Sequence, residues 1–484
     1  MKYTGLGKNA FLYAVGIISI RAAAFLLIPI YTYSMSVADY GLLSVLLQTA
    51  QIMMIMIGMG SRTALMRFAK EYEDKGEIGL LIGSTILINL SGAVAVTAVS
   101  ALPLLPMFRG VLHNPNPLRF VLLTCAAASS NCLANHLLGY YRAENKGLNV
   151  TLSTIAAAVS LIGLTAVFLR VLRLGIQGAL IAQTIVYGAL AVFLLTFIAA
   201  RNRLRVSLPL SWKVIKFGLP LIVVVSGSLI TQGTAFYFLS HFAGLEQVGI
   251  YSLGMKIALA VEMVLILPLQ MAYEPFVYRQ KVDERLWKAI TRLLTYSTVT
   301  FAFTAAAVAF VARDLLPWIA PPVFGSAYPI IFLILPALAF RSVYYIGESL
   351  LLLDNRTDLA ATIVSGFTLA SIALNYFFIS WWGIYGAACA MSLTVAGTGI
   401  TAMKLGLKRA PLRLEKDRLL VASLLLLGFL SVVYTFHAAS SYLYYTVVPA
   451  TVLAAIVLLY ISKFLREDER HVIQSLLLRS DHGC

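Results

Sequence analysis

The chain has 484 residues, of which 60% are hydrophobic and only 12% are charged. A soluble globular domain carries about 25% charged residues. This composition therefore excludes a soluble globular protein and predicts that most of the surface faces lipid. The net charge of +16 would suit a nucleic-acid-binding protein, but the placement of the charges, given below, favours a membrane topology instead. The four cysteines and six histidines show neither a disulfide framework nor metal-ligand spacing, so we expect no metal site.

Apolar stretches long enough to cross a bilayer, at roughly 20 residues each, follow one another along the whole chain. They predict an all-α integral membrane protein with about fourteen transmembrane helices. The expected spans lie near 9–33, 40–60, 78–107, 118–139, 148–169, 175–200, 214–240, 248–272, 289–312, 328–352, 359–381, 383–403, 419–437 and 442–462. The third is long, and we expect a tilt or a break near Pro103. The first is too long for a cleavable signal peptide.

The segment that follows the second span, 61–77, alternates apolar and basic residues. Leu65, Met66 and Phe68 are interleaved with Arg62 and Arg67. This amphipathic pattern is typical of a helix that lies at a membrane interface.

The first half of the chain repeats in the second half at an offset of 208 residues. Gly41 matches Gly249 and Ser44 matches Ser252, and far along the chain the run GIQGAL at 175–180 lies over GIYGAA. Each repeat has six spans, an even number, so both have the same orientation and are related by an axis along the membrane normal. We expect a first bundle at 1–200, a linker at 201–212, a second bundle at 213–412, and two further helices with a tail at 413–484. Two like bundles in a membrane are typical of a transporter that binds its substrate between them.

Basic residues gather on one side of the predicted membrane. If the loops alternate, 29 of the 37 lie on the side of the N-terminus, five lie on the opposite side and three lie within spans. The positive-inside rule then places both termini in the cytoplasm. Part of the basic excess is also expected to attract anionic lipid headgroups.

Five charged side chains lie inside predicted spans and are the candidate substrate-binding residues. Each would cost about 2.5–3.5 kcal/mol facing lipid, so we expect them to face water, one another or the bundle interior. Three are basic and two acidic, which favours an anionic substrate. An ion pair that fixes helix packing is the alternative role for each. The five are Arg21, Lys256, Glu262, Arg341 and Glu348.

The spacing of these charges along their spans favours different arrangements. Arg341 and Glu348 share a helix face about 10.5 Å apart along the axis, which suits two groups lining one cavity rather than a direct pair. Lys256 and Glu262, six residues apart, point in different directions, so we expect another partner for at least one of them.

Several runs resemble the polysaccharide-biosynthesis flippases of the multidrug/oligosaccharidyl-lipid/polysaccharide (MOP) exporter superfamily. They are IPIYTYSMSVADYGLLSVLLQ at 28–48, GMGSRTALMRF at 58–68, KFGLPLI at 216–222, FLSHFAGLEQVGIYSLGMKIA at 238–258 and EPFVYR at 274–279. The resemblance covers nearly the whole chain and implies a MATE-like fold of two six-helix bundles around a central cavity. Many relatives carry an acidic–basic pair just before the FLS run, where this chain has Ala235 and Phe236, so any role of that pair cannot be carried over.

The resemblance implies a flippase, not an enzyme, that moves a polyprenyl-pyrophosphate-linked glycan across the cytoplasmic membrane by alternating access. Its partners would be this glycolipid, membrane lipids and the polysaccharide polymerase machinery, and no cofactor other than a coupling H⁺ or Na⁺ is implied. Arg21, Lys256 and Arg341 would then bind the pyrophosphate, and Glu262 and Glu348 would line the same substrate cavity. Arg62 and Arg67 would lie at the cytoplasmic entrance or be simply solvated at the interface. The alternatives are a cation-coupled multidrug exporter of the same fold, which needs a cavity rich in carboxylates, and a membrane-embedded glycosyltransferase or polymerase, which needs catalytic residues in large loops.

Overall fold

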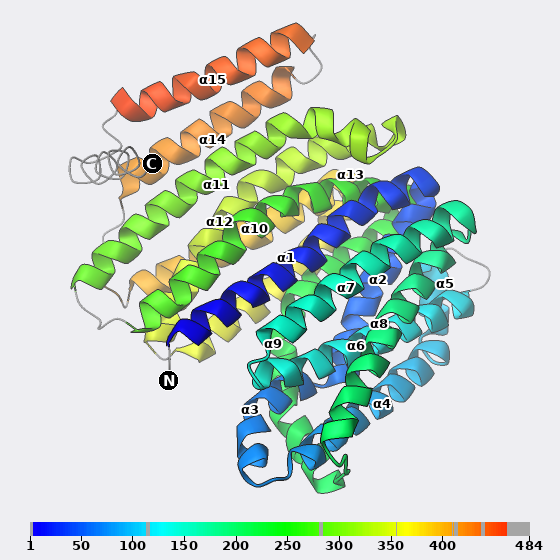
Figure 1. The fold of residues 1–484 in the computed structure, drawn as a ribbon. Helices are drawn as coiled ribbons and strands as arrows, with labels where there is room; N and C mark the ends of the chain where they lie inside the picture. Colours follow the sequence, from blue (N-terminus) through cyan, green and yellow to red (C-terminus); the bar gives the residue numbers. More distant parts are fainter. Residues whose placement is uncertain are drawn as a thin grey trace, which may run out of the picture.

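A computed structural model describes residues 3–112, 117–279, 284–354, 356–408, 410, 415–436 and 441–461. Within these residues every regular element is a helix (Figure 1). The tail expected beyond the last span, 463–484, lies outside the described residues.

The first repeat forms eight α-helices. They are α1 (Tyr3–Ser34), α2 (Val37–Gly58), α3 (Ser61–Asp74), α4 (Ile78–Ala101), α5 (Leu105–Leu112), α6 (Pro117–Ala143), α7 (Gly147–Ala166), which continues in a π-helical turn over Val167–Val171, and α8 (Gly175–Arg201). The expected break near Pro103 is present, because α4 ends at Ala101 and α5 starts at Leu105. The amphipathic segment after the second span is α3, which buries Ser61, Ala64, Leu65 and Ala69.

The second repeat forms α9 (Leu208–Phe242), α10 (Leu245–Arg279), α11 (Glu284–Ile319), a 3₁₀ turn η2 (Pro322–Ala327), α12 (Tyr328–Leu353) and α13 (Thr357–Leu407). α13 is long enough for two spans, and its backbone turns at Gly383 with φ 54° and ψ −127°. This turn separates the two spans expected at 359–381 and 383–403. Two further helices follow, α14 (Lys416–Phe436) and α15 (Ser441–Ile461).

The helix count agrees with the sequence. With the halves of α13 taken separately, the described chain contains fourteen helices of about 20 residues or more, the length that crosses a bilayer. Nine helical segments of the described chain also have the hydropathy of a membrane span over at least 18 residues. α13 counts once among the nine.

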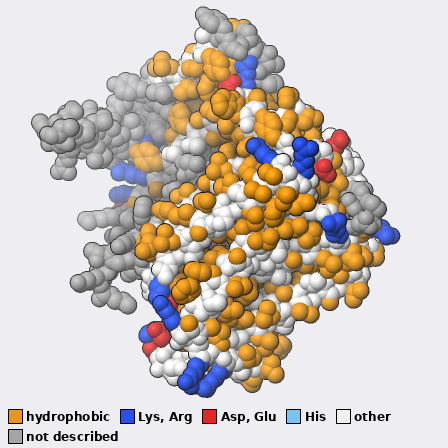
Figure 2. All heavy atoms as spheres, turned by 45° about the vertical axis from the view of Figure 1, so that its right-hand side comes forward, with side chains coloured by type: hydrophobic (Ala, Val, Ile, Leu, Met, Phe, Trp, Pro, Cys, Tyr) orange, Lys and Arg blue, Asp and Glu red, His pale blue; other side chains and the backbone are white. Residues whose placement is uncertain are grey.

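The surface has the character of a lipid-facing one. Figure 2 shows a face on which hydrophobic side chains predominate and Lys and Arg stand in a few separate groups. Valines in the middle of long helices are largely exposed, with Val94 of α4 at 72% and Val192 of α8 at 63%. A largely apolar face of this kind is typical of a surface that contacts membrane lipid.

The two repeats use equivalent contacts. α1 packs along α7, and α9 packs in the same way along α13, while α2 and α10 meet where the two bundles touch. α14 and α15 lie outside α11, on the side away from the first bundle (Figure 1). We call the end of the molecule where α1 gives way to α2 the distal end, and the opposite end, which carries α3 and the linker between α8 and α9, the basic end.

The linker and the start of α9 are held against the first bundle. Residues 202–207 are not helical, whereas 208–212, expected in the linker, already belong to α9. The Phe217 ring lies 5.3 Å from the Phe68 ring of α3, and the Lys213 ammonium lies 5.0 Å from the same Phe68 ring. The basic end of α9 therefore forms part of the first bundle's packing.

Candidate functional site

A cavity of about 540 Å³ lies between the two bundles. Its wall comes from α1, α2, α6, α7 and α8 of the first repeat and from α9 and α10 of the second. The polar lining consists of two cations, five carboxamides, two tyrosines and two serines, and no carboxylate from the described residues lines it. These polar residues are Arg21, Lys256, Gln48, Gln51, Asn131, Gln183, Gln232, Tyr31, Tyr187, Ser44 and Ser252.

Lys256 reaches the cavity from the middle part of α10. Its ammonium donates a hydrogen bond to the Tyr40 hydroxyl at 3.0 Å and lies 4.8 Å from the centroid of the same ring. Tyr40 is fully buried at the start of α2, so this contact joins the two bundles. Neither the hydroxyl nor the aromatic face of Tyr40 is a counter-ion, so these contacts leave the ammonium available to an anionic ligand.

Arg21 lies on the same cavity, on α1 of the first repeat. Its side chain is exposed, and within the described part of the chain it makes no ion pair or hydrogen bond. An uncompensated guanidinium in the middle of a span is costly against lipid, so its place on the wall of a polar cavity is the favourable one.

Arg341 and Glu262 do not line this cavity. They pair with each other, with Arg341 Nη2 3.5 Å from Glu262 Oε1, and their side chains are 24% and 18% exposed. Glu348 accepts a hydrogen bond from the Tyr344 hydroxyl at 2.9 Å and does not line the cavity either. Of the five intramembrane charges, Arg21 and Lys256 thus line one cavity, whereas Arg341 and Glu262 form an ion pair with each other.

Arg62 and Arg67 stand apart from the cavity. Both are exposed on α3 at the basic end. The aliphatic part of Arg62 lies against Gly139 of α6.

The carboxamides are the residues that the sequence interpretation missed, because it considered only charged groups inside spans. One signal was available for Gln48, which occupies the position of Lys256 at the 208-residue offset. A second was the cost of burying any amide in an apolar span without a partner, which makes each such residue a candidate for a polar cavity.

At the distal end the bundles are joined by a symmetric pair of hydrogen bonds. Thr32 Oγ1 of α1 donates to the Ile319 carbonyl of α11 at 2.6 Å, and Ser240 Oγ of α9 donates to the Val111 carbonyl of α5. Thr32 and Ser240 are equivalent at the 208-residue offset, and so are Val111 and Ile319. Tyr33 adds a third bond, from its hydroxyl to the Pro317 carbonyl at 2.6 Å.

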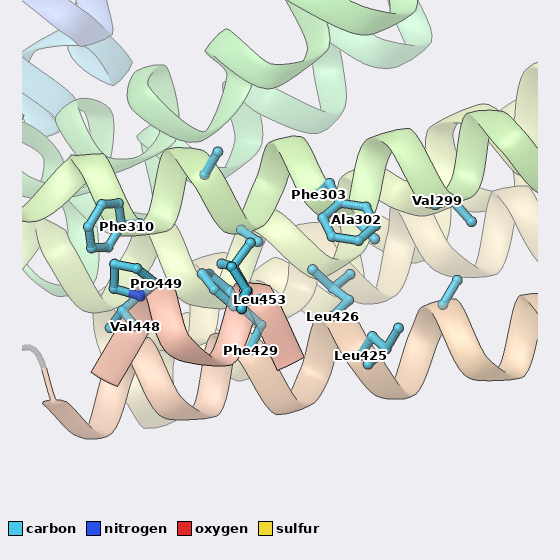
Figure 3. Close-up of a pocket in the computed structure, with 14 residues that line it drawn as sticks. Val299, Ala302, Phe303, Phe310, Leu425, Leu426, Phe429, Val448, Pro449 and Leu453 are labelled. Carbon is cyan, nitrogen blue, oxygen red and sulfur yellow. The ribbon is translucent and has the colours of Figure 1, made fainter. Parts of the chain in front are cut away.

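A second hollow, of about 550 Å³, lies between α11, α14 and α15 (Figure 3). Its lining is apolar throughout and includes Phe303, Phe310, Phe429, Pro449 and Leu453. It offers hydrocarbon contacts only, and it differs in this from the cavity between the bundles.

Comparison with known protein families shows to which family the chain belongs. The family model described as "Polysaccharide biosynthesis protein" matches residues 6–281, which is more than half of the chain. The chain belongs to this family. The family predicted from the sequence is thereby confirmed, whereas a search of curated proteins gave no match.

Solved structures of membrane transporters share the fold of this chain. The lipid II flippase MurJ in its inward closed conformation is 13% identical with a TM-score of 0.71, over 93% of this chain and 98% of that one. An inward-facing multidrug resistance MATE family transporter of the MOP superfamily is 15% identical with a TM-score of 0.65, over 81% and 94% of the two chains. The Vibrio cholerae MATE transporter VcmN in the bent form is 17% identical with a TM-score of 0.56, over 87% and 98%. The predicted MATE-like fold of two bundles and two added helices is thus confirmed.

Proposed function

We propose that this protein is a flippase that carries a polyprenyl-pyrophosphate-linked oligosaccharide across the cytoplasmic membrane by alternating access, for the synthesis of a cell-surface polysaccharide. The family membership supports a role in polysaccharide biosynthesis, and the shared fold supports transport. The observation that carries the proposal is that Arg21 and Lys256 both line one cavity, which no carboxylate of the described residues lines.

The two cations suit a pyrophosphate. A guanidinium presents forked N–H donors that match phosphate oxygens, and an ammonium presents a compact charge with three donors. Arg21 and Lys256 lie on different bundles, so a doubly charged diphosphate held between them would link the two halves. The polyprenyl tail would stay outside, against the apolar faces of the helices.

The basic end is proposed to face the cytoplasm, because most of the Lys and Arg among the described residues are expected on that side. Arg62 and Arg67, exposed on α3, would then lie where the headgroup enters and would attract its charge. Arg341 and Glu262, with Glu348 nearby in sequence, would serve packing within the second bundle, since Arg341 and Glu262 compensate each other.

A cation-coupled multidrug exporter of the same fold is the rival function. It would need carboxylates to hold its cationic substrate and coupling ion, and the described lining of the cavity supplies amides and cations instead. The geometry therefore favours the anionic glycolipid. A membrane-embedded glycosyltransferase or polymerase finds less support, because the solved structures that share this fold are described as a flippase and as transporters.

The test is transport in proteoliposomes with a fluorescent polyprenyl-pyrophosphate glycan, scored by its protection from a membrane-impermeant quencher. Arg21→Ala and Lys256→Met should each slow transport by about tenfold or more, because one charge-assisted hydrogen bond contributes about 1.5–3 kcal/mol. The matched control is Lys75→Ala. Lys75 is an exposed lysine at the C-terminal end of α3 and pairs with Glu71 of that helix. Wild-type rates from both cavity variants, with the protein folded, would overturn the proposal.

A further inference from the structure

The wall of the cavity carries more hydrogen-bonding capacity than a pyrophosphate can use. Five carboxamides line it, from α2, α6, α8 and α9: Gln48, Gln51, Asn131, Gln183 and Gln232. A phosphate at neutral pH only accepts hydrogen bonds, and the two cations already supply strong donors for it. Each carboxamide offers two N–H donors and a carbonyl acceptor, the combination that matches groups which both donate and accept.

Three of these carboxamides are unused within the described part of the chain. Gln51, Gln183 and Gln232 make no hydrogen bond there, and each retains some exposure. Gln48 uses one donor, from Nε2 to the Leu229 carbonyl at 3.1 Å. Asn131 accepts from Asn135 Nδ2 at 2.5 Å, which leaves its own amide N–H groups. Polar groups in the middle of spans are costly unless a ligand or water satisfies them.

We propose that these carboxamides form the sugar-binding part of the site, and that they recognise the hydroxyl or acetamido groups of an uncharged sugar next to the pyrophosphate. This rests on the proposed function and adds the substrate class of its glycan. Sugar hydroxyls donate and accept at once, as the amides do. Tyr187, half-buried in the same wall, would add an aromatic ring for apolar contact with the sugar ring. An acidic sugar would compete with the diphosphate for Arg21 and Lys256.

Two lipid probes test whether the carboxamides bind the sugar while the cations bind the pyrophosphate. One is a polyprenyl pyrophosphate that carries an uncharged glycan, and the other is the same polyprenyl pyrophosphate without sugar. Wild-type protein in detergent should bind the first about tenfold more tightly, which corresponds to two or so net hydrogen bonds. In the double variant Gln51→Leu/Gln183→Leu, this preference should fall to about twofold, while the affinity for the sugarless lipid stays within about twofold of wild type.

The controls separate this inference from the proposed function. Gln177→Leu makes the same change on α8 outside the cavity lining and should keep the full preference. Arg21→Ala should weaken both lipids by the same factor. A wild type that binds both lipids equally, or a double variant that loses both in parallel while it remains folded, would overturn the sugar-binding role alone. A wild type that binds neither lipid would overturn the proposed function and this inference with it.

Discussion

Ser44 Oγ and Ser252 Oγ lie 2.8 Å apart and share a hydrogen bond, and the two serines are 208 residues apart in sequence. They occupy the same position of the two repeats. A residue can contact its own counterpart only on the axis that relates the two copies, as at an isologous interface. The pseudo-two-fold axis therefore passes between α2 and α10 at this pair, and we expect a rocking of one bundle against the other to change this contact.

A disulfide at this position should lock the bundles together. In Ser44→Cys/Ser252→Cys, oxidation should form the bridge readily, because side-chain atoms already in contact leave the two β-carbons within reach of each other. We expect transport to stop on oxidation and to return on reduction, measured in proteoliposomes.

The control for the lock is each single cysteine variant, treated with the same oxidant. Oxidation should not lower the activity of either single variant below its own reduced level, although the chain keeps Cys125, Cys132 and Cys389 in the described residues. A cross-linked double variant that transports at the uncrosslinked rate would show that the α2–α10 contact does not change during transport.

The same interface leaves no room for a side chain at Gly41. An added β-carbon there would lie 1.9 Å from the backbone carbonyl oxygen of Leu245, and one at Gly249 would lie 2.4 Å from that of Val37. Because backbone atoms cannot step aside, Gly41→Ala should hold α2 and α10 apart. We expect faster labelling of Ser44→Cys by a membrane-impermeant maleimide in this background than in the parent.

Gly428→Ala on α14 is the matched control, because a β-carbon there meets no atom within 4 Å. It should leave the labelling rate unchanged. Equal labelling in the Gly41→Ala and parent backgrounds would mean that the helices shift without opening the interface.

The Arg341–Glu262 pair should behave as a structural unit. Glu262→Gln or Arg341→Gln alone leaves a partly buried charge without its partner, which we expect to cost on the order of 1–3 kcal/mol and to lower the temperature of thermal unfolding by several degrees. The double variant should recover much of the loss, since neither charge remains. Thermal unfolding in detergent measures all three.

Arg21→Gln provides the contrast for this pair. Arg21 has no partner in the described residues, so its replacement should leave the unfolding temperature unchanged while it slows transport. Strictly additive effects of Glu262→Gln and Arg341→Gln would show that the two side chains do not stabilise each other.

Gly383 carries a backbone conformation that other residues avoid. Its φ of 54° and ψ of −127° make the turn between the two spans of α13, and a β-carbon there would meet no neighbouring atom. Gly383→Ala should therefore destabilise the protein through backbone strain alone, by about 1–3 kcal/mol. Gly366→Ala lies in the helical part of α13 with equally free surroundings and should be neutral or stabilising, by up to about 1 kcal/mol. The two unfolding temperatures, compared side by side, decide the point.

Much of the fold could be predicted, because membrane-spanning helices and an internal repeat both produce patterns that are visible in the sequence. Hydrophobic length predicted the spans, and the 208-residue offset predicted that Ser44 and Ser252 are equivalent. The offset alone does not say that equivalent residues touch, because this depends on where the axis passes. The linker was expected to run to residue 212, but Ser207 caps α9 by accepting a hydrogen bond from the Leu210 N–H, and so the helix begins earlier.

The site was only partly accessible from the sequence. Arg21 and Lys256 stand out as charges in apolar spans, yet nothing in their spacing says that they share a cavity while Arg341 turns to Glu262. That choice depends on how α10 and α12 are rotated against each other, which is a property of packing across residues far apart in the chain. The carboxamides are uncharged, so a prediction based on formal charges inside spans does not include them.

The two bonds from Thr32 and Ser240 end on main-chain oxygens, at Ile319 and Val111. A peptide carbonyl is present whatever residue occupies its position. Replacement of Val111 or Ile319 by other apolar residues thus cannot delete the acceptor, and only the two hydroxyl-bearing positions need to be preserved. The hydrogen bonds that join the two bundles at the distal end therefore tolerate substitution at the acceptor residues. The ends of α5 and α11 can diverge between relatives without loss of these bonds.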